Sequence, residues 1–241
     1  MKATKSGSFK AVPLPEPQTT LARCYSVIDI GTTPDIYKGK QNPRRKFVRK
    51  IRITWELPAH TAVFNEEKGP EPFVVGVEVS ASTSDNSALS KLISAWRNKP
   101  LTLLEQEGFD PGTMVGKTGM ISFIHVRKAD YRGKEISEIT NENTVLKLNA
   151  ITSKPKAVEA PPNRNSYMYW DWDEVATKGF EALKEKFESI PLWIQKKCAE
   201  SKEFKQYAGS YKIKGTEEEG ETQESQPEEQ TAKKTVAGDD W

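Results

Sequence analysis

Three features of the sequence predict a mainly β protein with added helices. Residues 46–57 alternate between apolar and polar side chains, which is the period of a strand with one buried face. Other short segments rich in β-branched and aromatic residues are bounded by Gly and Pro, as strands usually are. An apolar stripe with helical spacing lies among these segments, and two further helical segments follow them along the chain.

The first half of the chain contains three predicted strands. The first strand covers 22–30, and the turn that ends it leads into a basic loop over 35–45. The second strand covers 46–57, and its alternation predicts a buried apolar face and a basic outer face. A loop rich in Pro and Gly over 58–72 separates it from the third strand, 73–81.

A helix and then more strands follow. The helix begins at a cap, Ser84 or Asp85, and runs to about Arg97. The next strand covers 118–127, and one or two further strands lie within 134–151. The apolar stripe of the predicted helix consists of Leu89, Leu92, Ile93 and Trp96.

The order of these elements predicts a particular fold. A helix between the third and fourth strands is the arrangement of an OB-fold five-stranded barrel. The turn-rich stretches 31–45 and 128–134 fall where an OB fold carries its first and last hairpin loops. These are the loops that usually embrace the ligand of such a barrel.

The whole chain divides into five predicted segments. The ends are polar, and the linker contains three prolines, whereas the stretch after the linker is aromatic and then helical. The segments are a flexible N-terminal arm (1–20), an OB-fold nucleic-acid-binding domain (21–151), a linker (152–166), a helical extension packing on the barrel (167–214) and a disordered acidic tail (215–241). In the extension, we expect helices over 173–189 and 192–202.

Composition excludes several classes of protein. No run of 18 apolar residues is present, so no transmembrane span is expected, and no secretory signal is visible at the N-terminus. Cys24 and Cys198 are too few for a disulfide framework, which fits a reducing cytoplasm. With His60 and His125 they have no metal-ligand spacing, and no catalytic motif stands out. We therefore expect no cofactor, no metal and no enzymatic activity.

The formal net charge of +2 conceals a strong asymmetry. Residues 216–241 hold nine acids and two bases, a net charge of −7. Residues 1–215 hold 34 bases and 25 acids, a net charge of +9. A basic body predicts a polyanionic partner, and an acidic tail can compete for the same surface.

Most of the candidate binding residues belong to one basic run. Residues 38–52 contain eight bases in fifteen positions and no acid, which predicts a continuous phosphate-binding patch over a loop and a strand. A solvated strand face is the alternative. Aromatic residues are interleaved with the bases, as in proteins that stack the bases of single strands. The predicted DNA-binding residues are Tyr37, Lys38, Lys40, Arg44, Arg45, Lys46, Arg49, Lys50, Arg52, Trp55, Phe123, Arg127, Lys128, Tyr131, Arg132 and Lys134.

The aromatic candidates differ in their expected environment. Tyr37 and Tyr131 lie in predicted loops beside bases, so they are the better stacking candidates. Phe47 and Trp55 lie on the same face of their predicted strand as its apolar side chains, which favours a place in the core. Phe123 is undecided, because either face of its strand could be the buried one.

The chain ends in Asp239, Asp240 and Trp241, after a polar acidic stretch. An aromatic ring at the end of a mobile acidic peptide could fill a pocket of a partner protein while the carboxylates meet a basic rim. The predicted partner-binding residues are therefore Asp239, Asp240 and Trp241. The alternative is a chain end without a role.

The basic body, the predicted barrel and the acidic tail ending in Asp-Asp-Trp resemble bacterial and tailed-phage single-stranded DNA-binding proteins. The segments Lys50–Pro58, Trp96–Pro100 and Pro191–Ile194 are similar to a group of such proteins encoded by bacteriophages. The resemblance implies a protein that coats and protects single-stranded DNA in phage DNA replication and recombination. It also implies recruitment of replication or recombination proteins through the tail, in the cytoplasm of the host cell and without a membrane.

Other readings remain open at this point. The C-terminal helices would either close the barrel or mediate self-association. Asp171 and Asp173 could hold Mg²⁺ in a nuclease, although one of them could instead cap the helix that follows. The third reading is an OB module that binds another protein, with an incidental basic face.

Overall fold

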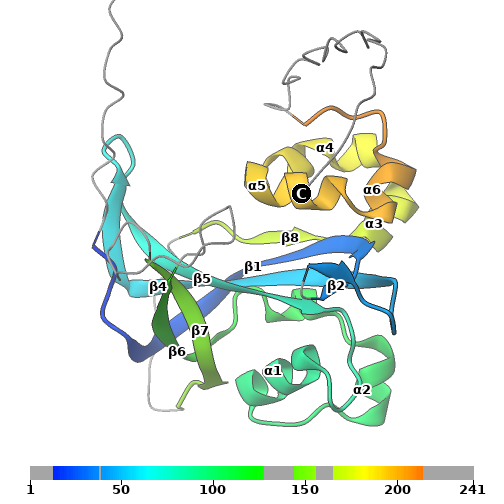
Figure 1. The fold of residues 1–241 in the computed structure, drawn as a ribbon. Helices are drawn as coiled ribbons and strands as arrows, with labels where there is room; N and C mark the ends of the chain where they lie inside the picture. Colours follow the sequence, from blue (N-terminus) through cyan, green and yellow to red (C-terminus); the bar gives the residue numbers. More distant parts are fainter. Residues whose placement is uncertain (1–12, 38, 128–143, 156–164, 214–241) are drawn as a thin grey trace, which may run out of the picture. The chain divides into compact units, whose positions relative to one another are not determined.

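The computed structural model describes residues 13–37, 39–127, 144–155 and 165–213 (Figure 1). The chain divides into two compact units, Met1–Tyr211 and Lys212–Trp241, and all the elements below lie in the first. No helix of the described residues is long and apolar enough to span a membrane.

One antiparallel sheet dominates this unit. Its strands follow the order β5-β4-β1-β6-β7, and the short β8 (Met168–Trp170) pairs in parallel with β1. The main strands are β1 (Gln18–Pro34), β4 (Phe47–Asn65), β5 (Gly69–Ser80), β6 (Thr118–Arg127) and β7 (Thr144–Ser153). The prediction of a mainly β chain with a helix between the third and fourth main strands is confirmed.

The predicted OB-fold five-stranded barrel is confirmed only as far as its antiparallel sheet. Within the described residues, β5 and β7 approach each other at the two ends of the sheet, but no strand pairing joins them. Hydrogen bonds therefore do not close the sheet, which has six strands rather than five. A separate small hairpin, β2 (Ile36–Tyr37) with β3 (Lys40–Gln41), stands in the predicted basic loop.

The second strand is longer than predicted. β4 continues to Asn65 through the predicted loop, because its pairing with β5 resumes after a register shift between Leu57 and Thr61. Pro58 lies within that irregular section, where its missing N–H costs no ladder hydrogen bond. The predicted loop 58–72 thus consists of the end of β4, a turn at 66–68 and the beginning of β5.

Helix α1 (Ala88–Arg97) packs on one face of the sheet (Figure 1). It begins at Ser87, whose hydroxyl accepts a hydrogen bond from the Ser90 N–H at 3.0 Å, and not at Ser84 or Asp85. The short helices α2 (Leu103–Gly108) and η1 (Pro111–Met114) follow it. All four residues of the predicted stripe are buried: Leu89, Leu92, Ile93 and Trp96.

The C-terminal helices lie on the other face of the sheet, beyond β8 (Figure 1). The predicted helix over 173–189 is two helices, because Gly179 has a φ of 83°, outside the helical region. Trp170, Trp172 and Phe187 lie in their aromatic core, with ring centroids 5.0–6.1 Å apart. The helices are α3 (Trp172–Lys178), α4 (Phe180–Glu188), α5 (Leu192–Ala199) and α6 (Lys202–Tyr207).

Helix α6 is joined to β1 by Glu203. The backbone N–H and the hydroxyl of Thr32 each donate a hydrogen bond of 2.6 Å to its carboxylate. The neighbouring Gly31 has a φ of 91°, and a Cβ there would lie 2.7 Å from the carboxylate and from Ser201. Glycine at this position therefore permits both the turn of the strand and the close approach of α6.

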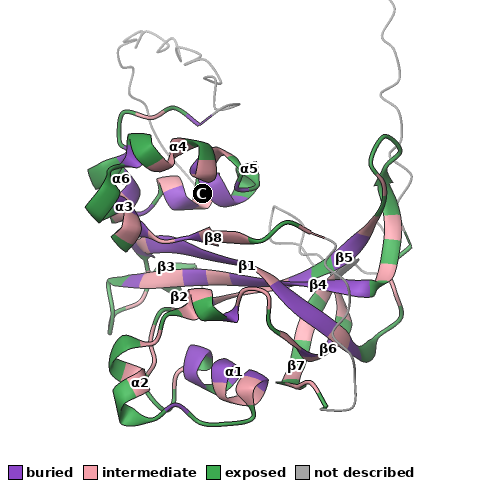
Figure 2. Ribbon diagram, turned by 180° about the vertical axis from the view of Figure 1, so that it is seen from behind, coloured by how far each residue is buried: buried purple, intermediate pink, exposed green. Residues whose placement is uncertain are grey.

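The C-terminal segment also changes the environment of β4. The sequence predicts a polar outer face, yet Thr54 and Glu56 are buried on it (Figure 2). The Glu56 carboxylate accepts hydrogen bonds from the backbone N–H and the amide of Asn165, at 2.7 and 2.9 Å. It also pairs with Arg23 at 3.9 Å. The centre of β4 is thus buried on both faces, and its partly exposed cations, Arg49, Lys50 and Arg52, lie in the first half of the strand.

Candidate nucleic-acid interface

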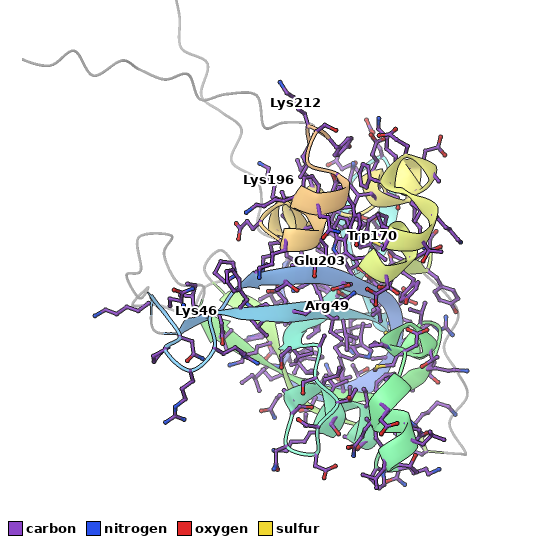
Figure 3. All side chains as sticks on the ribbon, turned by 90° about the vertical axis from the view of Figure 1, so that its right-hand side faces the viewer. Lys46, Arg49, Trp170, Lys196, Glu203 and Lys212 are labelled. Atoms are coloured by element: carbon purple, nitrogen blue, oxygen red, sulfur yellow. The ribbon has the colours of Figure 1, made fainter. Side chains whose placement is uncertain are left out.

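The structure divides the predicted basic patch into a loop part and a strand part. We call Lys40, Arg44 and Lys46 the loop cations, because Lys40 lies in the short β3 and the other two lie between β3 and the start of β4. They are exposed, and within the described part of the chain none of them forms an ion pair. Figure 3 shows Lys46 on this loop, away from the centre of the sheet where Arg49 lies. The loop cations are therefore available to a polyanion.

Arg45 is the exception within the loop. Its Nε donates a hydrogen bond of 2.9 Å to Asp35, which also accepts one of 2.9 Å from the Asn42 amide. The hydrogen bond from Arg45 lowers the pKa of Asp35 below its ordinary value. This contact fixes the hairpin, and it neutralises one of the cations that the sequence placed in the patch.

Arg49 faces the α1 side of the sheet and is surrounded by carboxylates. Its Nη2 lies 2.5 Å from Asp29, 2.9 Å from Asp173 and 3.4 Å from Asp171. Burial raises the pKa of Asp29, although the hydrogen bond from Arg49 acts in the opposite direction. The predicted continuity of the patch is wrong at this point, because Arg49 is turned away from Lys50 and balanced by acids that come from distant segments.

The same contacts bear on the nuclease reading. Asp171 accepts a hydrogen bond of 3.0 Å from the Asp173 N–H and so caps α3. Nη2 of Arg49 contacts both carboxylates. Among the residues that the structure describes, no group of three acidic, His or Cys side chains could hold a metal ion.

A cleft of about 410 Å³ opens beside Arg49, between the sheet and the segment around Phe109. Its polar lining is mostly acidic, and the Tyr169 hydroxyl lies 3.1 Å from Asp110 and 3.2 Å from Asp171. Burial and these carboxylates raise the pKa of Tyr169. An acidic cleft repels phosphate, so it does not continue the surface of the loop cations.

Two further bases of the run lie on the outer face of β4. Lys50 is partly exposed there and has no ion-pair partner among the described residues. The Nη1 of Arg52 contacts Glu78 at 3.3 Å, and the Arg52 guanidinium lies 4.4 Å from the ring centroid of Trp193. Arg52 is thus held in place by neighbours and carries its charge beside an aromatic ring.

Trp55 and Phe123 do not offer their rings to a ligand. Both are 0% exposed, because the face of the sheet that carries them is covered by α1 and its neighbours. The Trp55 ring packs 5.8 Å from that of Trp96. These two residues of the predicted site are corrected to core residues. The parity of Trp55 had already favoured the core.

Phe47 is more exposed than the sequence predicts. Its parity predicts a core position, but it is 42% exposed because it is the first residue of β4. The ammonium group of Lys202 in α6 lies 3.7 Å from its ring centroid. Phe47 and Lys202 thus join the loop cations to the C-terminal helices.

Trp193 is a functional candidate that the sequence reasoning missed. It is 48% exposed on α5. The helical period could have found it, since Ile194 and Cys198 are four residues apart on the buried side, while Trp193 and Lys197 share another side.

Several predicted site residues lie outside the described residues, and their roles stay predictions. The side chains of Tyr37 and Arg127 are in this group, although their backbones belong to β2 and β6. The others are Lys38, Lys128, Tyr131, Arg132, Lys134, Asp239, Asp240 and Trp241.

Comparisons of the chain with protein-family models, with curated proteins and with solved structures found no match.

Proposed function

We propose that the chain is a non-enzymatic protein that binds single-stranded DNA and coats and protects it during phage DNA replication or recombination. The observation that carries this proposal is the group of loop cations beside the exposed ring of Phe47 and the ammonium of Lys202. Unpaired cations neutralise phosphates, and open rings accept the stacked bases of a single strand.

The sheet supports an OB-type barrel for this protein. OB folds are partly open Greek-key barrels that bind oligonucleotides at their second and third strands and at two loops. Here β4 and β5 are the second and third main strands, and the loop cations precede β4. The approach of β5 to β7 without pairing corresponds to the open side of such a barrel.

The remaining parts of the proposal follow from the sequence. The acidic tail would recruit replication or recombination proteins through Asp239, Asp240 and Trp241. The two cysteines are free and buried in the structure, and we place the protein in the cytoplasm of the host cell.

Titration of a fluorescent oligo(dT) at several salt concentrations tests the DNA-binding surface. In the variant Lys40→Gln/Arg44→Gln/Lys46→Gln, the slope of log K against log salt should fall by about 0.7 per lost phosphate contact, so by roughly two units. A matched control removes three exposed lysines elsewhere, as Lys68→Gln/Lys91→Gln/Lys99→Gln. This control should keep the wild-type slope.

Three outcomes would contradict the proposal. An equal loss of slope in both triple variants would show that only total charge matters and remove the assigned surface. Failure of the wild type to bind oligo(dT) at low salt would favour the protein-interaction module. Cleavage of the strand in the presence of Mg²⁺ would favour the nuclease.

A further inference from the structure

An exposed tryptophan lies on α5, over the outer face of β4 and β5. Trp193 is 48% exposed, whereas the four other described tryptophans are at most 4% exposed. A large aromatic side chain that stays in water does not gain the favourable free energy of burying its apolar surface. An open indole that is held in one place therefore indicates a contact that the isolated chain does not make.

The support beneath this ring comes from both strands. The Arg52 guanidinium lies 4.4 Å from the Trp193 centroid, and on β5 it lies against Gly76. A Cβ at Gly76 would be 2.5 Å from Nη2 of Arg52, so glycine leaves the room in which the guanidinium lies. Arg52 is thereby held between the strand and the indole.

One oxygen of Glu78 connects this arginine to α5. Oε1 of Glu78 accepts a hydrogen bond of 3.3 Å from Arg52 Nη1 and another from the Lys197 ammonium, which lies 5.5 Å from the Trp193 centroid. Both cations therefore contact one carboxylate oxygen beside the indole, and Trp193 is still 48% exposed.

The neighbourhood of Trp193 is positively charged. Arg52 and Lys197 share the single negative charge of Glu78, and the exposed Lys196 adds another positive charge on α5. Lys196 and Lys46 of the loop lie on the same side of the molecule in Figure 3. The surroundings of Trp193 therefore suit a ligand that combines a flat ring with negative charge.

We propose that the exposed part of Trp193 stacks on a base of single-stranded DNA, while Lys196 contacts a neighbouring phosphate. This inference rests on the proposed function and adds a second contact to the path of the strand, beyond the loop cations. The ligand is a single strand because the bases of a duplex have no free faces. Stacking on a ring of this kind is sequence-tolerant, since every base has a π-face.

A second copy of the chain is a weaker occupant of the same surface. Two other apolar residues, Leu192 on α5 and Val74 on β5, are 43% and 44% exposed, which would suit a protein contact. A symmetric contact, however, would bring Lys196 and Lys197 of two copies together. Repulsion between these like charges opposes such a dimer and favours a polyanion.

Tryptophan fluorescence tests the inference directly. The background variant Trp241→Phe removes the tryptophan at the chain end, and in it the emission of Trp193 should be quenched when oligo(dT) is added. In the double variant Trp193→Phe/Trp241→Phe, oligo(dT) should still bind, but most of the quenching should disappear, since the other tryptophans are buried.

Affinity provides the second measurement. Trp193→Ala should weaken oligo(dT) binding about tenfold, within the range for loss of one stacked base. Leu192→Ala is the matched control, because it removes a similarly exposed apolar side chain from the same helix, and it should leave affinity unchanged. Circular dichroism should show that both variants fold like the wild type.

The possible failures separate the two proposals. If Trp193→Ala binds oligo(dT) like the wild type and the quenching persists without Trp193, the inference is overturned and the proposed function stands. If the wild type binds no oligo(dT), both are overturned. If Trp193→Ala instead converts an oligomer to a monomer in sedimentation, Trp193 belongs to an interface between copies and not to the DNA path.

Discussion

The loop half of the basic run carries five cations and the strand half carries three, and the environments of the two groups differ strongly. The loop cations are exposed and without ion pairs among the described residues. Arg49 and Arg52, only a few positions later, are held by carboxylates at 2.5–3.4 Å. A count of charges along a sequence therefore overstates the charge that a ligand can reach.

The difference follows from where the partners come from. The loop lies at the edge of the structure and meets few other segments. The strand crosses the centre, where buried cations must be paired because desolvation of an isolated charge is costly. We expect loop variants to change DNA affinity and strand variants to change stability, and the following predictions test this separation.

The largest effect is expected for Arg49→Met. The Asp29 side chain is only 7% exposed and would lose its cationic partner, so the free energy of unfolding should fall by about 3 kcal/mol at pH 7. The variant that remains folded should keep the salt slope of the wild type for oligo(dT). Urea unfolding, combined with the DNA titration, measures both quantities.

The pH dependence of this variant provides a control. Burial already raises the pKa of Asp29 above its ordinary value of 3.8, and loss of Arg49 should raise the pKa further. A raised pKa in the folded state means that protonation favours folding, so the penalty should be smaller at pH 5 than at pH 7. A penalty that grows as the pH falls would show that Asp29 is not the group left unpaired.

A smaller effect is expected for Phe47→Ala. Its ring is 42% exposed beside Lys202, and loss of a stacking ring weakens binding by about 1–3 kcal/mol. We expect a loss of oligo(dT) affinity near the lower end of this range, because the ring is only partly open. Phe47→Tyr keeps the ring and should bind like the wild type. Equal binding by the alanine variant would limit the loop to phosphate contacts.

The smallest effect is expected for Asp35→Asn. This substitution tests Arg45, which lies in the loop but is paired with a carboxylate like the strand cations. The substitution releases Arg45 from its ion pair and leaves an amide oxygen for the contact with Asn42. Oligo(dT) affinity should rise two- to threefold, a roughly estimated gain of one available cation at moderate salt. Arg45→Gln in the same background should cancel the gain, and a gain that persists would arise from the removed negative charge alone.

Patterns within single segments predicted much of the fold. Strand β6 has the predicted bounds, and the stripe of α1 is buried as the helical period requires. The predicted face of β4 is buried at Ile51, Ile53 and Trp55. These features follow from the spacing of apolar residues, which acts over a few positions and is visible in any one segment.

Predictions that depended on distant segments were less successful. The outer face of β4 was expected in water, but Glu56 is covered by the segment around Asn165, more than a hundred positions away. Phe47 is exposed despite its parity, because no layer covers the first residue of the strand. Closure of the barrel also depended on strand pairing between β5 and β7, which alternation within each strand does not encode.

Local patterns were enough to predict the succession of strands along the chain, the place of α1 between them, the buried face of β4 and the basic charge of the body. Which cations and rings are free depends on the folded arrangement of distant segments. Arg49 pairs with Asp173, which lies 124 positions away, and Trp193 meets Arg52 across two elements. Periodicity reports burial along one segment, whereas ion pairing and ring exposure depend on which segments the fold brings together.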